Sequence, residues 1–149
     1  IRDRYYNSAG NNSLFLLNIP PNKNGLFAES DVKRLKQIGK WLRKEDELVI
    51  IEYQRTDKNG GFETELKFPK QSVDRIRMSE DTTKSQRIEK YSIYAGSKKV
   101  FEGTIIGFSK IAVFEPVVTD TLTIKIEECR KEPYLKTAEP VATGAYRVK

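Results

Sequence analysis

The side chains that could carry out chemistry in this sequence are few, and their types narrow the reactions it could catalyse. The chain has no histidine and one cysteine, Cys129. These counts exclude Ser-His-Asp and Cys-His nucleophiles, histidine metal sites, multi-cysteine zinc sites and an internal disulfide. Cys129 is expected to be an unreactive thiol near a strand end, and a reactive thiolate beside Arg130 is the alternative.

Two adjacent carboxylates, Glu80 and Asp81, are the next candidates. They could bind a metal ion or a sugar from a loop, or they could form a strand end and an Asx turn with Arg87 as a partner. Gln86 and Arg87 could donate to sugar hydroxyls or could lock this loop to the next strand. Their place directly before an alternating strand over residues 88–93 favours the structural role.

The overall charge is weakly informative. The sequence has 27 Lys and Arg against 21 Asp and Glu, which gives a net charge of +6. A basic surplus suits a nucleic-acid or anionic partner, but interspersed acids and bases are also typical of an ordinary surface. No apolar run approaches 18 residues, no signal peptide is visible, and the first residue is Ile1. We therefore expect no membrane contact and a piece cut from a longer protein.

The elements that must position these groups divide into two regions. In the first, residues 1–46, an apolar run over residues 14–19 ends at Pro20 and Pro21 and predicts a strand buried on both faces. A turn follows, and then a helix over residues 31–44 is predicted from one apolar stripe: Val32, Leu35, Ile38 and Leu42.

The second region, residues 47–149, predicts an all-β domain. Short β-rich segments are separated by turn residues, and alternation is clearest where Leu122, Ile124 and Ile126 face one side. The predicted strands are 48–53, 62–68, 73–79, 91–95, 99–101, 111–114 and 122–126. Many short strands at regular spacing predict an antiparallel sandwich or barrel, so the fold class is mainly β.

Residues 14–42 resemble the end of the catalytic domain of α-L-fucosidases, glycoside hydrolase family 29. The shared features are an apolar strand that ends in Asn-Ile-Pro-Pro, a turn with Gly, and a helix with a Gly-x-Trp-Leu sequence. They are Asn18, Ile19, Pro20, Pro21, Gly25, Gly39, Trp41 and Leu42, with a lead-in of Tyr6, Asn7, Ser8, Gly10, Asn12 and Ser13. The resemblance implies the last βα unit of a (β/α)₈ barrel.

Residues 65–128 are similar to the C-terminal domain of bacterial members of that family. The matching positions are Glu80-Asp81, Gln86-Arg87-Ile88, Tyr91, Ile93, the stretch 103–107, Lys110-Ile111 and Phe114. This resemblance implies a galactose-binding-like, discoidin-type jelly roll. The family's Asp-rich opening loop is replaced by the shorter segment 48–62, where Asp57 and Asn59 do not make up the ligand set of a calcium ion.

The resemblance implies a parent enzyme that hydrolyses terminal α-L-fucosides and is periplasmic or secreted. Such hydrolysis needs a pair of carboxyl groups flanking the sugar, and the family's nucleophile lies upstream of the final βα unit. We therefore expect a non-catalytic accessory region without cofactor or metal, which supports the barrel and binds carbohydrate. An autonomous carbohydrate-binding module and a basic nucleic-acid-binding domain are the alternatives, although no nucleic-acid recognition motif is present.

Five residues are the candidates for carbohydrate binding. A sugar site combines an aromatic ring with a few polar groups. Tyr53, Phe108 and Tyr134 could supply the ring, and Asn59 and Arg130 could supply donors. Each could equally belong to the core, a rim or the ordinary surface. The expected partners are the upstream barrel and fucosylated or galactosylated glycans. The apolar strand 14–19 predicts either packing onto the β-domain or pairing with a second copy.

Overall fold

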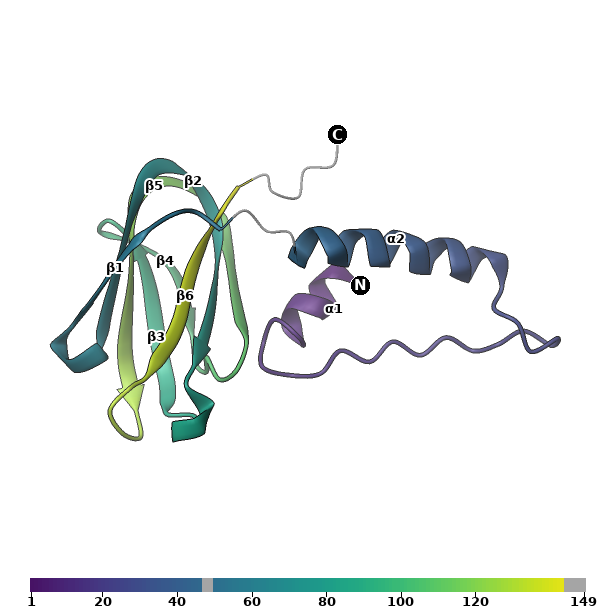
Figure 1. Ribbon diagram of the computed structural model, residues 1–149, viewed down its shortest axis with the longest axis horizontal. Helices are drawn as coiled ribbons and strands as arrows, with labels where there is room; N and C mark the ends of the chain where they lie inside the picture. The colour runs from purple at the N-terminus through teal and green to yellow at the C-terminus, as the bar shows by residue number, and fades with distance from the viewer. Residues whose placement is uncertain (47–49, 144–149) are drawn as a thin grey trace.

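The computed structural model of the chain describes residues 1–46 and 50–143, which form two helices and a strongly bent β-sheet (Figure 1). The helices are α1 (Arg2–Asn7) and α2 (Glu29–Asp46). The strands are β1 (Gln54–Lys58), β2 (Glu63–Glu80), β3 (Ile88–Ala95), β4 (Lys98–Gly103), β5 (Lys110–Cys129) and β6 (Leu135–Ala142), with short 3₁₀ turns η1 (Asn59–Gly61) and η2 (Thr82–Lys84).

Six strands of the described chain form one antiparallel sheet in the order β1-β2-β5-β3-β4, and β6 pairs with the second half of β2. The mainly β, antiparallel fold predicted from alternation is therefore confirmed. The two longest strands, β2 and β5, pair with each other in three stretches, with register shifts between Lys67 and Gln71 and between Val73 and Arg75. Pro69 lies in the first of these gaps, where it has no N–H to donate to the ladder. Both strands bend there, and the sheet folds over itself into two layers (Figure 1).

The core lies between these two layers. Leu66, Ile76, Ile93 and Ile124 are fully buried and come from both halves of the bent sheet. The predicted alternation of β5 is confirmed, since Leu122, Ile124 and Ile126 are all buried. Two pairs of predicted short strands, 62–68 with 73–79 and 111–114 with 122–126, are instead halves of β2 and β5.

In residues 1–46 the predicted helix is present, but the predicted strand over residues 14–19 is not. The helix predicted over residues 31–44 is confirmed as α2, which begins two residues earlier. Residues 14–19 form no strand, and Leu14 and Leu16 are 84% and 83% exposed. A parallel strand needs hydrogen-bonded neighbours on both sides, and the described residues supply none to this segment. No helix in the described ranges has the length and apolar character required to cross a bilayer.

The connection between the two regions carries less strand than predicted. Residues 47–49 lie outside the described residues, and with them the predicted domain boundary between residues 46 and 47. Ile50 forms an isolated bridge with Val141, and the N–H of Ile51 donates to the carbonyl of Pro140 at 3.0 Å. Of the strand predicted over residues 48–53, the described residues 50–53 have only this bridge, and the regular ladder begins at Gln54.

The segment after α1 packs directly against the sheet. The Ile111 N–H donates to the Gly10 carbonyl at 2.8 Å, and Asn11 bridges Lys110 in antiparallel register. Arg75, which is 8% exposed, donates from Nη1 to the hydroxyl of Tyr6 at 2.7 Å. These contacts hold residues 6–12 against the beginning of β5 and place them beside the loop between β4 and β5.

Candidate functional site

The adjacent carboxylates are structural. Glu80 is 3% exposed, and its two oxygens accept from the N–H groups of Arg87 at 2.8 Å, Ile88 at 3.0 Å and Gly107 at 2.7 Å. It ties the β2–β3 connection to the β4–β5 loop. Asp81 Oδ1 accepts from the backbone N–H of Thr83 at 3.2 Å and from its hydroxyl at 2.6 Å, which is the predicted Asx turn. These two hydrogen bonds lower the pKa of Asp81.

Gln86 and Arg87 also make structural contacts. Arg87 donates from Nη1 to the Glu132 carbonyl and from Nε to the Lys84 carbonyl, both at 2.9 Å. Gln86 Oε1 accepts from the Asn12 side chain at 3.3 Å. The interpretation that these residues lock the loop to its surroundings agrees with the geometry.

A first pocket, which we name the Tyr134 pocket, has a volume of about 220 Å³ and lies between η1 and the β5–β6 loop. Its lining consists of Arg55, Asp57, Gly60, Gly61, Glu132, Pro133, Tyr134 and Leu135. The structure therefore brings the turn that contains Asn59 close to Tyr134. The arginine and the aspartate of this pocket are already paired. Arg55 donates to Asp57 and to the carbonyls of Leu135 and Lys136, and the Lys84 ammonium covers the Tyr134 ring at 3.3 Å from its centroid.

Arg130 lies outside this pocket in an exposed ion pair. Its Nε donates to Glu89 Oε1 at 2.6 Å, and this hydrogen bond raises the pKa of Arg130. An exposed pair of this kind is held only weakly, so it fixes little around it.

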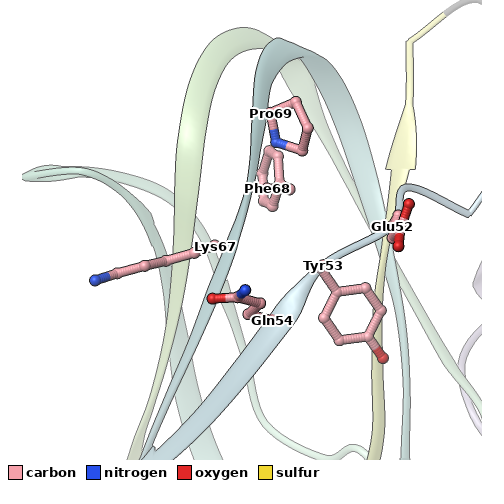
Figure 2. Close-up of a pocket in the computed structure, with 6 residues that line it drawn as sticks. All are labelled: Glu52, Tyr53, Gln54, Lys67, Phe68 and Pro69. Atoms are coloured by element: carbon pink, nitrogen blue, oxygen red, sulfur yellow. The ribbon is translucent and has the colours of Figure 1, made fainter.

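A second pocket, the Tyr53 pocket, has a volume of about 390 Å³ at the edge of β1 and β2. Its lining consists of Glu52, Tyr53, Gln54, Lys67, Phe68 and Pro69. Figure 2 shows that the Tyr53 ring points toward β6 whereas Lys67 points to the opposite side. Burial, followed by the nearby charge of Glu139, raises the pKa of the Tyr53 phenol. The polar ends of the lining side chains therefore do not converge on one ligand position.

A third hollow, the Phe108 groove, has a volume of about 220 Å³ and crosses β5, β2 and β6. Its lining consists of Arg77, Met78, Ser79, Phe108, Ser109, Lys110, Ile111, Thr137 and Glu139. Arg77 lies directly opposite Glu139, and Ser79 lies opposite Thr137, so these four side chains share one face of the sheet. Phe108 is 60% exposed at the rim.

The polar groups of the Phe108 groove are only partly paired. Ser79 and Thr137 hydrogen-bond through their hydroxyls at 2.7 Å. The ammonium of Lys110 donates to Asn11 Oδ1, and burial lowers the pKa of Lys110. The side chains of Arg77 and Glu139 make no hydrogen bond or ion pair with any residue in the described ranges. Only this hollow among the three therefore combines an exposed ring with an available donor and an available acceptor.

The sequence interpretation named Phe108 but missed Arg77, Ser79, Thr137 and Glu139. Arg77 and Ser79 alternate with the buried Ile76 and Met78 on β2, which could have placed them on an outer face. Glu139 could not be found in this way, because β6 was not among the predicted strands.

Comparison with known proteins gives one consistent result. Residues 4–47 match the family model described as Alpha-L-fucosidase. Alpha-L-fucosidase 1 of Arabidopsis thaliana is 60% identical over 35 residues, which are 24% of this chain and 7% of that protein. A solved Bacteroides ovatus structure, assigned as an α-L-fucosidase, is 30% identical with a TM-score of 0.78, covering 99% of this chain and 26% of that one. A glycoside hydrolase 29 family member from an unknown rumen bacterium is 24% identical with a TM-score of 0.80, covering 95% of this chain and 28% of that one.

The proteins matched are all glycoside hydrolases. Within that class, residues 4–47 match the α-L-fucosidase family, and nearly the whole chain aligns with part of a solved α-L-fucosidase. The chain spans about a quarter of the length of the solved relatives and 7% of the curated one.

Proposed function

We propose that this chain is the non-catalytic C-terminal region of an α-L-fucosidase that hydrolyses terminal α-L-fucosides. Residues 1–46 form the last βα unit of the catalytic barrel, and residues 47–149 form a galactose-binding-like jelly roll that supports the barrel. The family match over residues 4–47 supports the first part of this proposal. The alignment of nearly the whole chain with about a quarter of two solved relatives supports a segment of a longer enzyme.

One observation carries the proposal. Residues 14–19 lack regular structure, and apolar side chains along residues 14–27 are exposed, including Leu14, Leu16, Leu26 and Phe27. Apolar side chains gathered on one exposed segment are typical of a surface that a partner covers. Neighbouring strands and helices of a barrel would cover these side chains and would also pair the backbone of residues 14–19.

In this proposal, the upstream catalytic barrel of the parent enzyme carries out the hydrolysis. A retaining glycosidase needs two carboxyl groups about 5–5.5 Å apart on either side of the sugar. The adjacent pair Glu80 and Asp81 is already hydrogen-bonded to backbone N–H groups, and Glu80 is buried. We therefore expect this chain alone to be inactive.

The remaining partners follow from the same proposal. We expect the parent to be periplasmic or secreted and to use no cofactor. We expect no membrane or nucleic-acid partner, since the exposed bases of α2, such as Lys33, Lys36 and Lys40, are those of a solvated helix face. In the absence of the barrel, a second copy can cover residues 14–27 instead.

The test is reconstitution. The polypeptide encoded upstream of Ile1 is produced separately, and hydrolysis of 4-nitrophenyl α-L-fucopyranoside is measured for each polypeptide and for the mixture. We expect no hydrolysis by this chain, and we expect hydrolysis and co-elution for the mixture. A variant with Leu14→Asp and Leu16→Asp should fail to reconstitute. Release of nitrophenol by this chain alone, or full activity of the upstream part without it, would refute the proposal.

A further inference from the structure

We propose that the Phe108 groove binds the pyranose ring of one neutral sugar residue. The Phe108 ring contacts the C–H face of the sugar, Arg77 donates hydrogen bonds to its hydroxyl oxygens, and Glu139 accepts from its hydroxyl groups. This inference deepens the accessory role proposed above by naming a site and a ligand class, and it rests on that role only for the expectation that the ligand is a glycan.

The first support is the pairing of strands β2 and β6. Antiparallel register sets Arg77 and Glu139 directly opposite each other, yet no ion pair forms between them within 4.0 Å. Both side chains are partly buried, and neither has a partner among the described residues. Their polar atoms are not among the buried unpaired ones, so both groups are open to a ligand that supplies a donor and an acceptor in place of solvent. A sugar hydroxyl supplies both from one atom.

The second support is the anchored backbone that carries the aromatic ring. The backbone N–H of Phe108 donates to Asn12 Oδ1 at 2.9 Å, and the N–H of Gly107 donates to the buried Glu80 at 2.7 Å. The loop is therefore anchored on both the N-terminal segment and the β2–β3 connection, while the Phe108 ring stays exposed. A loop whose backbone is already anchored loses less freedom when a ligand packs on its side chain.

The third support concerns size and charge. A volume of about 220 Å³ lies below the lower end of drug-sized pockets, ~300 Å³, which fits one ring better than a chain of sugars. The Lys110 ammonium is directed at Asn11 Oδ1, so Arg77 is the cation left for a ligand and Glu139 balances it. Balanced charge favours a neutral sugar over an anion.

The other two pockets lack this combination. In the Tyr134 pocket, Arg55 and Asp57 are bound to each other and to the chain, and Lys84 lies over the ring. In the Tyr53 pocket, Tyr53 and Lys67 point to opposite sides (Figure 2). Of these three hollows, the Phe108 groove is the one in which an exposed ring lies beside an unpaired donor and an unpaired acceptor.

The test is an NMR titration of the whole chain with methyl α-L-fucopyranoside and, separately, with methyl β-D-galactopyranoside. We expect weak, saturable binding of at least one sugar, with shift changes centred on Phe108, Arg77 and Glu139. Phe108→Ala and Arg77→Met should each weaken binding by about tenfold or more. Glu139→Gln should weaken it less, because the amide retains one acceptor. Phe62→Ala is the matched control, since Phe62 is also exposed but does not line the groove.

Three outcomes would overturn this inference. One is the absence of any shift change at the highest soluble concentration of either sugar. Another is sugar binding that persists in the folded Phe108→Ala and Arg77→Met variants. The third is binding of sodium sulfate but of neither sugar, which would make the groove an anion site. The result is separate from the reconstitution assay, because sugar binding is measured without any hydrolysis.

Discussion

The side chain of Asn12 holds the backbone of Phe108: its Oδ1 accepts the Phe108 N–H at 2.9 Å, from a position 96 residues earlier in the chain. The same amide donates to Gln86 Oε1 at 3.3 Å. Asn12 adopts a positive φ of 61°, a conformation that asparagine tolerates better than most residues. One residue of the N-terminal segment thus ties two loops of the β-sheet together.

Replacing Asn12 tests this connection. Asn12→Ala removes both hydrogen bonds and places alanine at a positive φ, so we expect the free energy of unfolding to fall by about 1–3 kcal/mol. Asn12→Asp keeps the acceptor for Phe108 and should lose less. Urea denaturation followed by circular dichroism gives both values. Equal losses in the two variants would mean that the Phe108 hydrogen bond contributes nothing.

A substitution at Gly107 tests how closely the backbone of Gly107 approaches the side chain of Asn12. A Cβ on Gly107, where φ is 60°, would lie 2.3–2.5 Å from three atoms of the Asn12 side chain. Gly96 has a similar φ of 58° and open space within 4 Å. We expect Gly96→Ala to cost about 1–2 kcal/mol from backbone conformation alone, and Gly107→Ala to cost clearly more. Thermal unfolding of the two variants should separate them, and matching melting temperatures would contradict the contact.

The burial of Tyr91 makes the stability of the fold depend on pH in the alkaline range. Its hydroxyl has no hydrogen-bond partner among the described residues, and burial raises the pKa of its phenol. The folded state keeps Tyr91 neutral while the unfolded state ionises above its ordinary pKa of 10.0. The stability that Tyr91 contributes is therefore complete below pH 10 and declines as pH rises above it.

The variant Tyr91→Phe removes the unpaired hydroxyl and the titration together. We expect it to raise the free energy of unfolding at neutral pH by about 1 kcal/mol and to flatten the decline between pH 9 and 11. Urea unfolding at a series of pH values measures both effects. Tyr94→Phe, at a partly exposed tyrosine of the same strand, is the control and should change neither. A loss of stability in Tyr91→Phe at neutral pH would show that its hydroxyl is satisfied in solution.

The exposed segment predicts self-association. The double variant Leu14→Asp and Leu16→Asp puts charge on the apolar side chains that a second copy would cover, so dimer formation should weaken at least about tenfold. Val118→Asp alters another exposed apolar side chain, on β5, and serves as the control. Sedimentation velocity over a range of protein concentrations measures the effect. A monomer at every concentration in the unaltered chain would rule out this pairing.

Alternation of apolar and polar residues predicted the strands and their buried faces, but not how the strands continue and pair. The alternation of Leu122, Ile124 and Ile126 placed one half of β5 in the core. Pro69 and Pro116 lie at irregularities of the β2–β5 pairing, where the strands bend and continue, so the short strands predicted on either side of each proline are parts of one strand. Pro140 lies within β6, and proline is unusual within a paired strand, so the sequence did not predict this strand. Whether a proline ends a strand or only bends it depends on the neighbouring strand, which local sequence does not contain.

In the candidate site, too, local sequence predicted one residue, and strand pairing brings the others to it. Phe108 was identified from its place beside a turn, whereas Arg77 and Glu139 meet only because β2 pairs with β6 in one register. The strand predicted over residues 14–19 failed for a related reason, since its apolar run specifies burial between neighbours that the described chain lacks.

The bend in β2 and β5 has a consequence for how the β-sheet unfolds. Because the same two strands run through both layers, neither layer can detach while the other stays intact. Amide protons of β3 in one layer and of the second half of β2 in the other should therefore exchange with solvent through a single cooperative opening. Local fraying should be confined to the helices and to edge strands such as β6.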